Sequence, residues 1–188
     1  VYGGENDVVF ETIESLNMRI PKLYIGNVRR NEIKFSINEF SYEGNHEEEK
    51  INNTVKRIEQ NILDEIKTIC YFPWTRQIEV ALIKILINEE NQNKVGKYYG
   101  NVDQFERLDV INRFKDNSIR AVLATKAFGM GVDIDNIKEV YHHAPSGNLS
   151  DYVQEIGRVA RKKSMIGRAA VDFSKNDLKF TKILYGLS

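Results

Sequence analysis

The sequence predicts an α/β domain built on a parallel β-sheet with helices on both of its faces. Short apolar runs alternate along the chain with helical patterns, and this alternation implies right-handed crossovers between parallel strands. The chain has 188 residues, of which 41% are hydrophobic, and this is enough to bury the core of one ordinary domain. Charged residues make up 29% of the chain and the net charge is zero. Disordered chains have a large net charge and few apolar residues, so we expect this chain to fold.

The start of the chain predicts one helix and one strand. Apolar residues at helical spacing predict a helix over residues 6–18, with Asn6 as a possible cap and Pro21 as its end. Apolar residues then alternate with polar ones over residues 32–39, as in a half-buried strand. The apolar residues of this strand are Ile33, Phe35 and Ile37.

The remaining elements follow a regular rhythm. Apolar residues at intervals of three or four predict an amphipathic helix over residues 46–66. Asp103 with Glu106, and Ser174 with Asp177, have the spacing of capping boxes, so each pair predicts the start of a helix. The other expected strands lie at 68–72, 98–99, 119–124 and 168–173, with one more strand that passes through residue 140. The other expected helices lie around 78–86 and 150–161.

The composition narrows the classes of function. Because 27 Lys and Arg balance 27 Asp and Glu, bulk charge does not explain nucleic-acid binding, which would need a local basic patch. The single cysteine, Cys70, cannot form an internal disulfide, and with three histidines it cannot build a multi-cysteine zinc site. The apolar runs are shorter than a membrane span, and the first residues lack the pattern of a secretion signal. We therefore expect a cytoplasmic protein with no membrane partner.

Three apparent nucleotide-binding motifs fail on inspection. Gly96-Lys97 lacks the first glycine of a phosphate loop and the following Ser or Thr that would reach magnesium. Gly129-Met130-Gly131 has Ile134 where a dinucleotide fingerprint needs its third glycine. Asp64-Glu65 falls at the end of a helix rather than at the end of a buried strand. The chain therefore shows no means of its own to hold a triphosphate and its metal.

A strand-to-turn segment gives the first positive signal. The apolar strand over 119–124 is followed at once by Thr125 and a glycine-rich turn that ends at Asp133. Ligands of open α/β sheets bind at this edge, and a glycine-rich turn brings backbone N–H groups close to an anion. The alternative is an ordinary turn in which Asp133 only satisfies backbone amides. On this segment alone, the two interpretations are equally weighted.

The segment Gln154 to Arg161 gives the second signal. Helical spacing would place Gln154, Arg158 and Arg161 on one face, with Val153, Ile156 and Ala160 toward the core. Two guanidinium groups side by side can stabilise charge on a transferring phosphoryl group. Gly157 within a helix suggests that something approaches the backbone closely. The alternative is a solvated basic face.

Together these segments resemble the last motifs of superfamily-two helicases, in their RecQ-like form. Residues 124–133 are similar to motif V, and residues 152–161 to motif VI. The intervening His142-His143-Ala144-Pro145 matches the histidine and proline that the family carries after the connecting strand, and residues 68–86 resemble motif IV. The chain departs from the RecQ pattern at Ala160, where the family has glycine, at Lys162-Lys163-Ser164, where it has Asp-Gly, and at Tyr99, where it has histidine.

The resemblance implies a RecA-like fold, a three-layer sandwich that forms the second half of a motor. Residues 1–20 would be the last helix of the preceding RecA-like domain, and residues 21–188 the C-terminal RecA-like domain. The cofactors would be ATP and Mg²⁺, with the metal held by the first domain. The partners would be that domain and nucleic acid, with DNA favoured. The isolated fragment would not hydrolyse ATP.

The resemblance also assigns roles to single residues. Arg158 and Arg161 would reach the γ-phosphate of ATP across the cleft, and Gln154 would position the attacking water or the phosphate. Gly131 and Asp133 would belong to the ATP site and couple it to nucleic acid. Thr75 and Thr125 would hold backbone phosphates of the strand. For Arg107, a phosphate contact and an internal ion pair remain equally open.

Two hypotheses follow for the whole chain. The first is the motor domain of an ATP-dependent helicase or translocase. The second is a noncatalytic nucleic-acid-binding module with a RecA-like fold, which would use Thr125 and the basic helix. A phosphate loop encoded upstream would decide between them. Trp74 is open to two interpretations as well, since it could stack on a base or pack against a loop.

Overall fold

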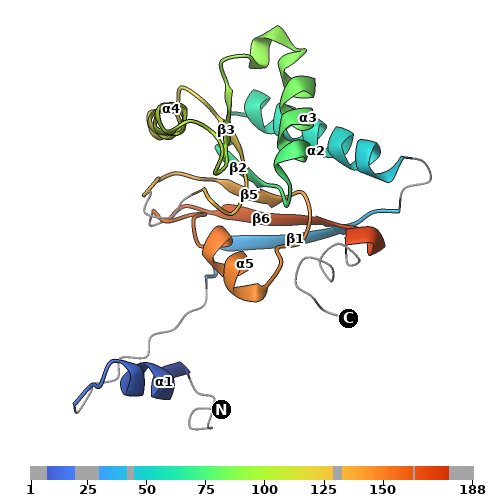
Figure 1. Ribbon diagram of the computed structural model, residues 1–188. Helices are drawn as coiled ribbons and strands as arrows, with labels where there is room; N and C mark the ends of the chain where they lie inside the picture. Colours follow the sequence, from blue (N-terminus) through green and yellow to red (C-terminus); the bar gives the residue numbers. More distant parts are fainter. Residues whose placement is uncertain (1–7, 20–29, 42–44, 129–132, 163, 178–188) are drawn as a thin grey trace. The chain divides into compact units, whose positions relative to one another are not determined.

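A computed structural model describes residues 8–19, 30–41, 45–128, 133–162 and 164–177, and it separates the chain into two units, residues 1–30 and 31–188. In the first unit, α1 spans Val8–Ser15 (Figure 1). The chain leaves α1 at Asn17, whose φ of 48° closes the helix end before Pro21 is reached. The expected cap Asn6, Pro21 and the expected domain boundary after residue 20 lie outside the described residues.

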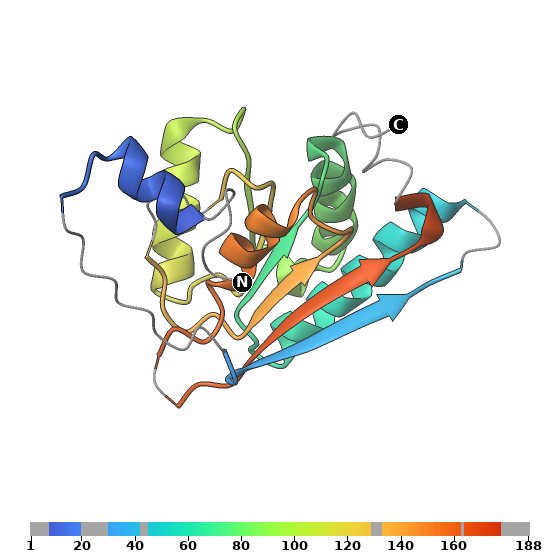
Figure 2. The same ribbon diagram turned by 90° about the horizontal axis from the view of Figure 1, so that it is seen from below.

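The described residues of the second unit form a sheet of six parallel strands, as the sequence predicts. Their order across the sheet is β1-β6-β5-β2-β4-β3, and Figure 2 shows the strand arrows running in a common direction. The strand expected at 98–99 is β3, which begins earlier, at Val95, and ends at Tyr98. The strands are β1 Ile33–Glu39, β2 Thr68–Tyr71, β3 Val95–Tyr98, β4 Ala121–Ala124, β5 Glu139–His142 and β6 Gly167–Phe173.

Helices cover both faces of the sheet, which confirms the predicted three layers (Figure 1). The core falls into two clusters because successive strand residues face opposite sides. Ile69 of β2 packs in the cluster of α4 and α5, whereas its neighbour Cys70 packs in the cluster of α2 and α3. The helices are α2 His46–Leu63, α3 Thr75–Leu86, α4 Gln104–Lys115 and α5 Leu149–Ile156, with a short 3₁₀ turn at Glu89–Asn91.

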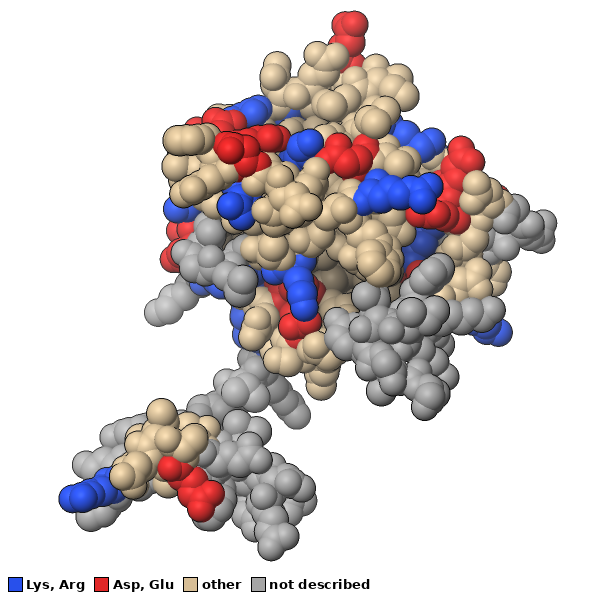
Figure 3. Space-filling view, in the orientation of Figure 1, with Lys and Arg blue, Asp and Glu red and all other residues tan. Residues whose placement is uncertain are grey.

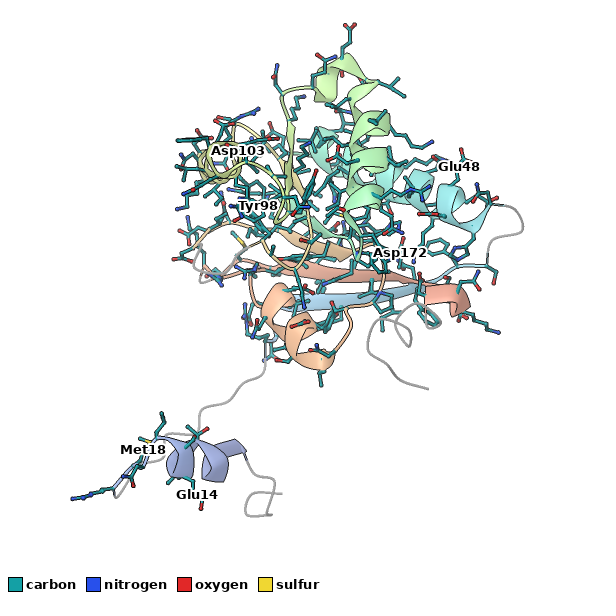
Figure 4. The ribbon with its side chains drawn as sticks, in the orientation of Figure 1. Glu14, Met18, Glu48, Tyr98, Asp103 and Asp172 are labelled. Carbon is teal, nitrogen blue, oxygen red and sulfur yellow. The ribbon has the colours of Figure 1, made fainter. Side chains whose placement is uncertain are left out.

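Side-chain caps fix where most of these helices begin. Asp103, labelled at the start of α4 in Figure 4, accepts a hydrogen bond from the Phe105 N–H at 2.8 Å, as its predicted capping role requires. Asn148 caps α5 in the same way by accepting from the Asp151 N–H at 2.8 Å. Trp74 opens α3 without a side-chain cap hydrogen bond. The first turn of α3 therefore keeps N–H groups that no capping side chain satisfies.

Strand β1 differs from its sequence expectation. Ile33 is buried, but Phe35 is 57% exposed and Ile37 is 75% exposed, although all three share one face. In the part of the chain that the structure describes, β1 lies at the sheet edge with β6 as its single neighbouring strand, so its side chains have less cover than those of the central strands. The alternating pattern therefore predicted the strand correctly, but the half-buried face that it predicted is buried only at Ile33.

Candidate functional site

The C-terminal ends of the central strands surround one cavity of about 740 Å³. Its walls come from the ends of β2, β4 and β5, from the start of α3 and from α5. Three predicted site residues line it, namely Thr125, Gln154 and Arg158. The structure thus brings the turn after β4 and the segment at α5 to one place, which is the edge where ligands of open α/β sheets bind.

Thr125 begins a tight turn directly after β4. Its N–H donates to the Tyr98 carbonyl at 3.2 Å, and its own carbonyl accepts from the Phe128 N–H at 3.0 Å. These backbone bonds fix the turn, so the partly exposed Thr125 hydroxyl is held at the cavity. The predicted site residue Gly131 lies outside the described residues.

The helix expected at 150–161 is shorter than its pattern suggests. α5 ends at Ile156, and Gly157 is its C-cap. Ala160 then takes a φ of 52°, a left-handed conformation in which the chain turns away from the helix axis. Arg158 and Arg161 therefore lie in a turn and not side by side on a helix face. Ile156 and Ala160 are buried as expected, but Val153 is 54% exposed.

Gly157 also has a simpler explanation than the one its sequence context suggested. A Cβ at this position would lie 3.0 Å from the Val153 carbonyl oxygen and 3.4 Å from that of Gln154. Both atoms belong to the backbone of α5 itself. The close approach at Gly157 is therefore made by the end of its own helix.

Arg158 lies beside Tyr71 at the wall of the cavity. Burial raises the pKa of the Tyr71 hydroxyl above its usual value, and the positive charge of the nearby Arg158 guanidinium partly opposes the rise. The Nε atom of Arg158 is buried and has no hydrogen-bond partner among the described residues. The guanidinium thus keeps one unsatisfied donor at the cavity wall.

Arg161 is held at a different place from Arg158. Its Nη1 atom lies 2.6 Å from Oδ1 of Asp133, and its Nε donates to the Gly157 carbonyl at 3.3 Å. The Arg161 side chain is 37% exposed and does not line the cavity. This ion pair connects the end of the glycine-rich turn to the segment after α5, a contact between two motifs that the sequence analysis had treated separately.

Sequence analysis missed a buried carboxylate that holds α5 to β5. Glu155 Oε2 lies 2.8 Å from His142 Nε2 and accepts from the Ser146 hydroxyl at 2.6 Å. His142 is 1% exposed, and its other ring nitrogen, Nδ1, has no partner among the described residues. The neighbouring His143 is also buried and contacts the Thr54 hydroxyl at 2.7 Å. Glu155 directly follows Gln154, so its place in motif VI was the signal that could have indicated it.

The other predicted strand-binding residues lie outside this cavity. Thr75 is the exposed first residue of α3. Arg107 of α4 lies over the Tyr98 ring, with its Cζ 5.9 Å from the ring centre. None of the ion pairs between described residues involves Arg107, so the ring contact takes the place of the ion pair that the sequence left open.

The sequence profile of the helicase conserved C-terminal domain matches residues 49–163, more than half of the chain. The chain belongs to this family. Its fold is the C-terminal RecA-like domain of superfamily-two helicases, in a RecQ-like form, as the resemblance indicated.

Relatives and solved structures agree with this helicase assignment. The ATP-dependent DNA helicase Q-like 5 of Arabidopsis thaliana is 38% identical over 85 residues, which cover 45% of this chain and 9% of that protein. The ATP-dependent DNA helicase RecQ of Bacillus subtilis is 31% identical over 96 residues, or 51% of this chain and 16% of that protein. The matched stretches thus span only a small part of these relatives.

Among solved structures, a Dbp5 variant of S. cerevisiae bound to RNA and ADP–BeF₃ superposes with a TM-score of 0.70 at 17% identity. That superposition covers 96% of this chain and 46% of Dbp5. The second domain of the DEAD-box helicase Mss116p, bound to an RNA duplex, gives a TM-score of 0.64 at 20% identity and covers 82% of this chain and 59% of that one. At these identities the likeness shows the fold of the helicase domain.

Two surface properties complete the description of the helicase domain. Acidic and basic side chains are interspersed on the face drawn in Figure 3, in keeping with the zero net charge. Within the described residues, no helix is long and apolar enough to cross a membrane.

Proposed function

We propose that this domain is the second motor domain of an ATP-dependent helicase or translocase that acts on DNA. Its ATP site would be completed by a preceding RecA-like domain of the same polypeptide. The DNA assignment draws on the two RecQ-like relatives, whose names describe ATP-dependent DNA helicases.

One observation carries the proposal. The turn after β4 and the end of α5 come together at the C-terminal edge of the sheet, where Thr125, Gln154 and Arg158 line one cavity. The Asp133–Arg161 ion pair joins the same two segments next to it. In a motor domain, the segment that contacts the nucleotide and the segment that contacts the strand must move together. The turn after β4 and the end of α5 are close enough to do so.

The residues present fit a phosphate of ATP. Arg161 is partly exposed, and its present partner Asp133 is 82% exposed, so the guanidinium can exchange this carboxylate for another anion. The guanidinium of Arg158, which lines the cavity, offers further donors. ATP, when bound, supplies a phosphoryl group whose transfer develops negative charge. We assign contacts with it to Arg158, Arg161 and Gln154. Gly131 and Asp133 would belong to the same ATP site and couple it to nucleic acid, and Mg²⁺ would be held by the preceding domain.

These contacts would couple ATP to movement along a strand. The guanidinium groups gain charge-assisted hydrogen bonds only when the two domains close, so closure is favoured while the phosphate is present. Thr75, Thr125 and Arg107 would hold strand phosphates, which carry no sequence information. Tightening and loosening these contacts in turn gives stepwise translocation.

The proposal is tested by ATP hydrolysis with and without single-stranded DNA. We expect no hydrolysis by the 188-residue chain alone and strand-stimulated hydrolysis by the full-length polypeptide. Thr125→Val in that polypeptide should raise the concentration of strand needed for half-maximal stimulation, because one phosphate contact is lost. Strand binding by a full-length protein that never hydrolyses ATP would instead support the noncatalytic module.

A further inference from the structure

A buried lysine lies at the edge of the sheet opposite the cavity. Lys67 directly precedes β2 and is 2% exposed. Among the described residues, its Nζ atom has no carboxylate in ion-pair distance. It lies 4.6 Å from the centre of the Phe114 ring and donates to two asparagine side chains. Lysine is almost never fully buried unless an opposite charge pairs with it, so Lys67 needs an explanation.

The two asparagines belong to different loops. Asn117 lies between α4 and β4, and Asn136 lies in the segment that leads into β5. Lys67 Nζ donates to Asn136 Oδ1 at 2.9 Å and to Asn117 Oδ1 at 3.1 Å, and Asn136 Nδ2 donates to the same Asn117 oxygen at 3.1 Å. Both asparagines have left-handed backbones, with φ of 68° at Asn117 and 58° at Asn136. Lys67 thus closes a triangle of hydrogen bonds that holds both turns.

The segment that contains Asn136, residues 133–138, lies beside residues 160–162. Two ion pairs and one backbone hydrogen bond join these two stretches. They are Asp133 Oδ1 to Arg161 Nη1 at 2.6 Å, Asp135 Oδ2 to Lys162 Nζ at 3.5 Å, and the Ala160 N–H to the Ile137 carbonyl at 3.1 Å. Lys67 therefore holds, through Asn136, the segment whose carboxylate at Asp133 contacts Arg161.

Stability alone does not account for the charge of Lys67. Burial and the positive charges of Arg120 and Lys162 lower the pKa of its ammonium to about 8, although Asp116 and Asp135 oppose this change. Between this value and the ordinary 10.5, the unfolded chain binds more protons than the folded chain, so stability rises with pH there. At neutral pH the charged side chain therefore costs folding free energy. A residue that costs stability is commonly retained for function.

We propose that Lys67 is a positioning residue for the hydrolysis of ATP. Its ammonium holds Asn136, and through Asn136 it fixes the segment that presents Asp133 to Arg161. The inference rests on the proposed function, in which Arg161 contacts a phosphate of ATP. Lys67 itself would touch neither ATP nor the strand, because it is buried at the N-terminal ends of the strands.

Lys67→Met in the full-length polypeptide tests this role, because methionine keeps an unbranched side chain but has no donor. We expect strand-stimulated kcat to fall about tenfold and the KM for ATP to change less than about twofold, since the residues that contact ATP are retained. Lys84→Met is the control and should leave kcat unchanged, since its ammonium is partly exposed and lies 3.9 Å from Glu48. Unchanged kcat in Lys67→Met, beside stimulated hydrolysis by the unmodified polypeptide, would overturn the inference but not the proposed function.

A double variant separates positioning from a general effect on the domain. If Lys67 acts through Asp133, then Lys67→Met should lower kcat less than about twofold in a polypeptide that already carries Asp133→Asn. An equal loss in both backgrounds would contradict the proposal, because the effect of Lys67 would then not pass through Asp133.

Two measurements on the 188-residue chain are independent of catalysis. In ¹⁵N-NMR spectra, the Nε–H signal of Arg161, assigned with Arg161→Lys, should shift and exchange faster with water in Lys67→Met, because Asp133 no longer holds the guanidinium. An unchanged signal would overturn the proposal. Urea unfolding of Lys67→Met at pH 7 should give a midpoint equal to or above that of the unmodified chain, since a buried charge is removed. A lowered midpoint would instead assign Lys67 to the stability of the fold.

Discussion

At the scale of single residues, the turn at Ala160 decides how the two arginines are arranged. Its φ of 52° is a conformation that glycine adopts without steric cost, and glycine is the residue that the RecQ pattern carries there. The Ala160 side chain is nevertheless retained in the core, where it packs with Val159. The reversal of direction at this residue separates Arg158 from Arg161.

Gly167 is the residue that leaves room for this turn. A Cβ at position 167 would lie 1.9 Å from Val159 Cγ1 and 3.2 Å from the Ala160 Cβ. We predict that Gly167→Ala lowers the free energy of unfolding by about 1–3 kcal/mol, because Val159 and its neighbours must shift. Urea unfolding measures the change. Gly100→Ala is the control, since its Cβ would meet no atom within 4 Å and should leave stability unchanged or slightly higher.

The buried imidazole of His143 should make the free energy of unfolding depend on pH. Burial lowers the pKa of this imidazole well below 6.5, and the nearby positive charges of Lys50 and His46 lower it further. The unfolded chain then binds a proton that the folded chain does not, so stability falls as the pH drops below about 6.5. From pH 7.5 to 5.5 this group should remove about 1.4 kcal/mol from the free energy of unfolding.

Urea unfolding of the chain and of His143→Asn at the two pH values isolates this contribution. The variant is expected to be less stable overall, because it loses the stacking of His143 on Phe72, but its stability should vary less with pH. An equal pH dependence in both proteins would mean that His143 is already protonated in the folded chain.

At the scale of elements, sequence and structure agree where a pattern is local and differ where it depends on packing. The six strands were identifiable because short apolar runs are bounded by caps and turns, as at Asp103. The end of α5 was missed because Gly157, which is its C-cap, was interpreted as a residue inside a longer helix. The exposure of Phe35 was missed because the place of β1 at the sheet edge is a property of the whole sheet.

The candidate site shows the same division. Its two segments were recognised from their residues, and the structure places Thr125 and Arg158 at one cavity. The partners within these segments were harder to predict, since Glu155 contacts His142 and Ser146, which lie 13 and 9 positions away in the sequence. The Asp133–Arg161 ion pair, between residues 28 positions apart, is of the same kind.

A buried carboxylate joins three elements at the opposite end of β5. Glu139 is completely buried and accepts from Arg57 Nε of α2 at 2.9 Å, from Asn61 Nδ2 at 2.7 Å and from Arg168 of β6. Burial alone would raise the pKa of this carboxyl, but the two arginines and Asn61 hold it below its usual value. The carboxylate therefore stabilises the fold in its ionised form.

We predict that Glu139→Gln lowers the free energy of unfolding by about 2–4 kcal/mol, because it leaves the half-buried Arg57 without its partner. Chemical denaturation at pH 7 measures the effect. Asp109→Asn is the matched control, since its ion pair with Arg113 is largely exposed and should contribute less than about 0.5 kcal/mol. Equal losses in the two variants would contradict a structural role specific to the buried carboxylate.

At the scale of the whole molecule, charge and architecture suit a domain that binds through few contacts. The net charge is zero, so the proposed affinity for a strand would come from a few placed donors rather than from a general positive field. In the proposed function, few contacts would let the domain release its strand readily, and the Asp133–Arg161 pair would connect this cycle to ATP.

The most direct test of the central claim is the strand-stimulated ATPase activity of the full-length polypeptide carrying Arg161→Ala. We predict a loss of at least a hundredfold in kcat with the strand still bound, because in the proposed function Arg161 acts on the transferring phosphoryl group. Arg113→Ala, on the exposed side of α4, should leave the activity unchanged. Full stimulated turnover in the Arg161→Ala protein would contradict the account.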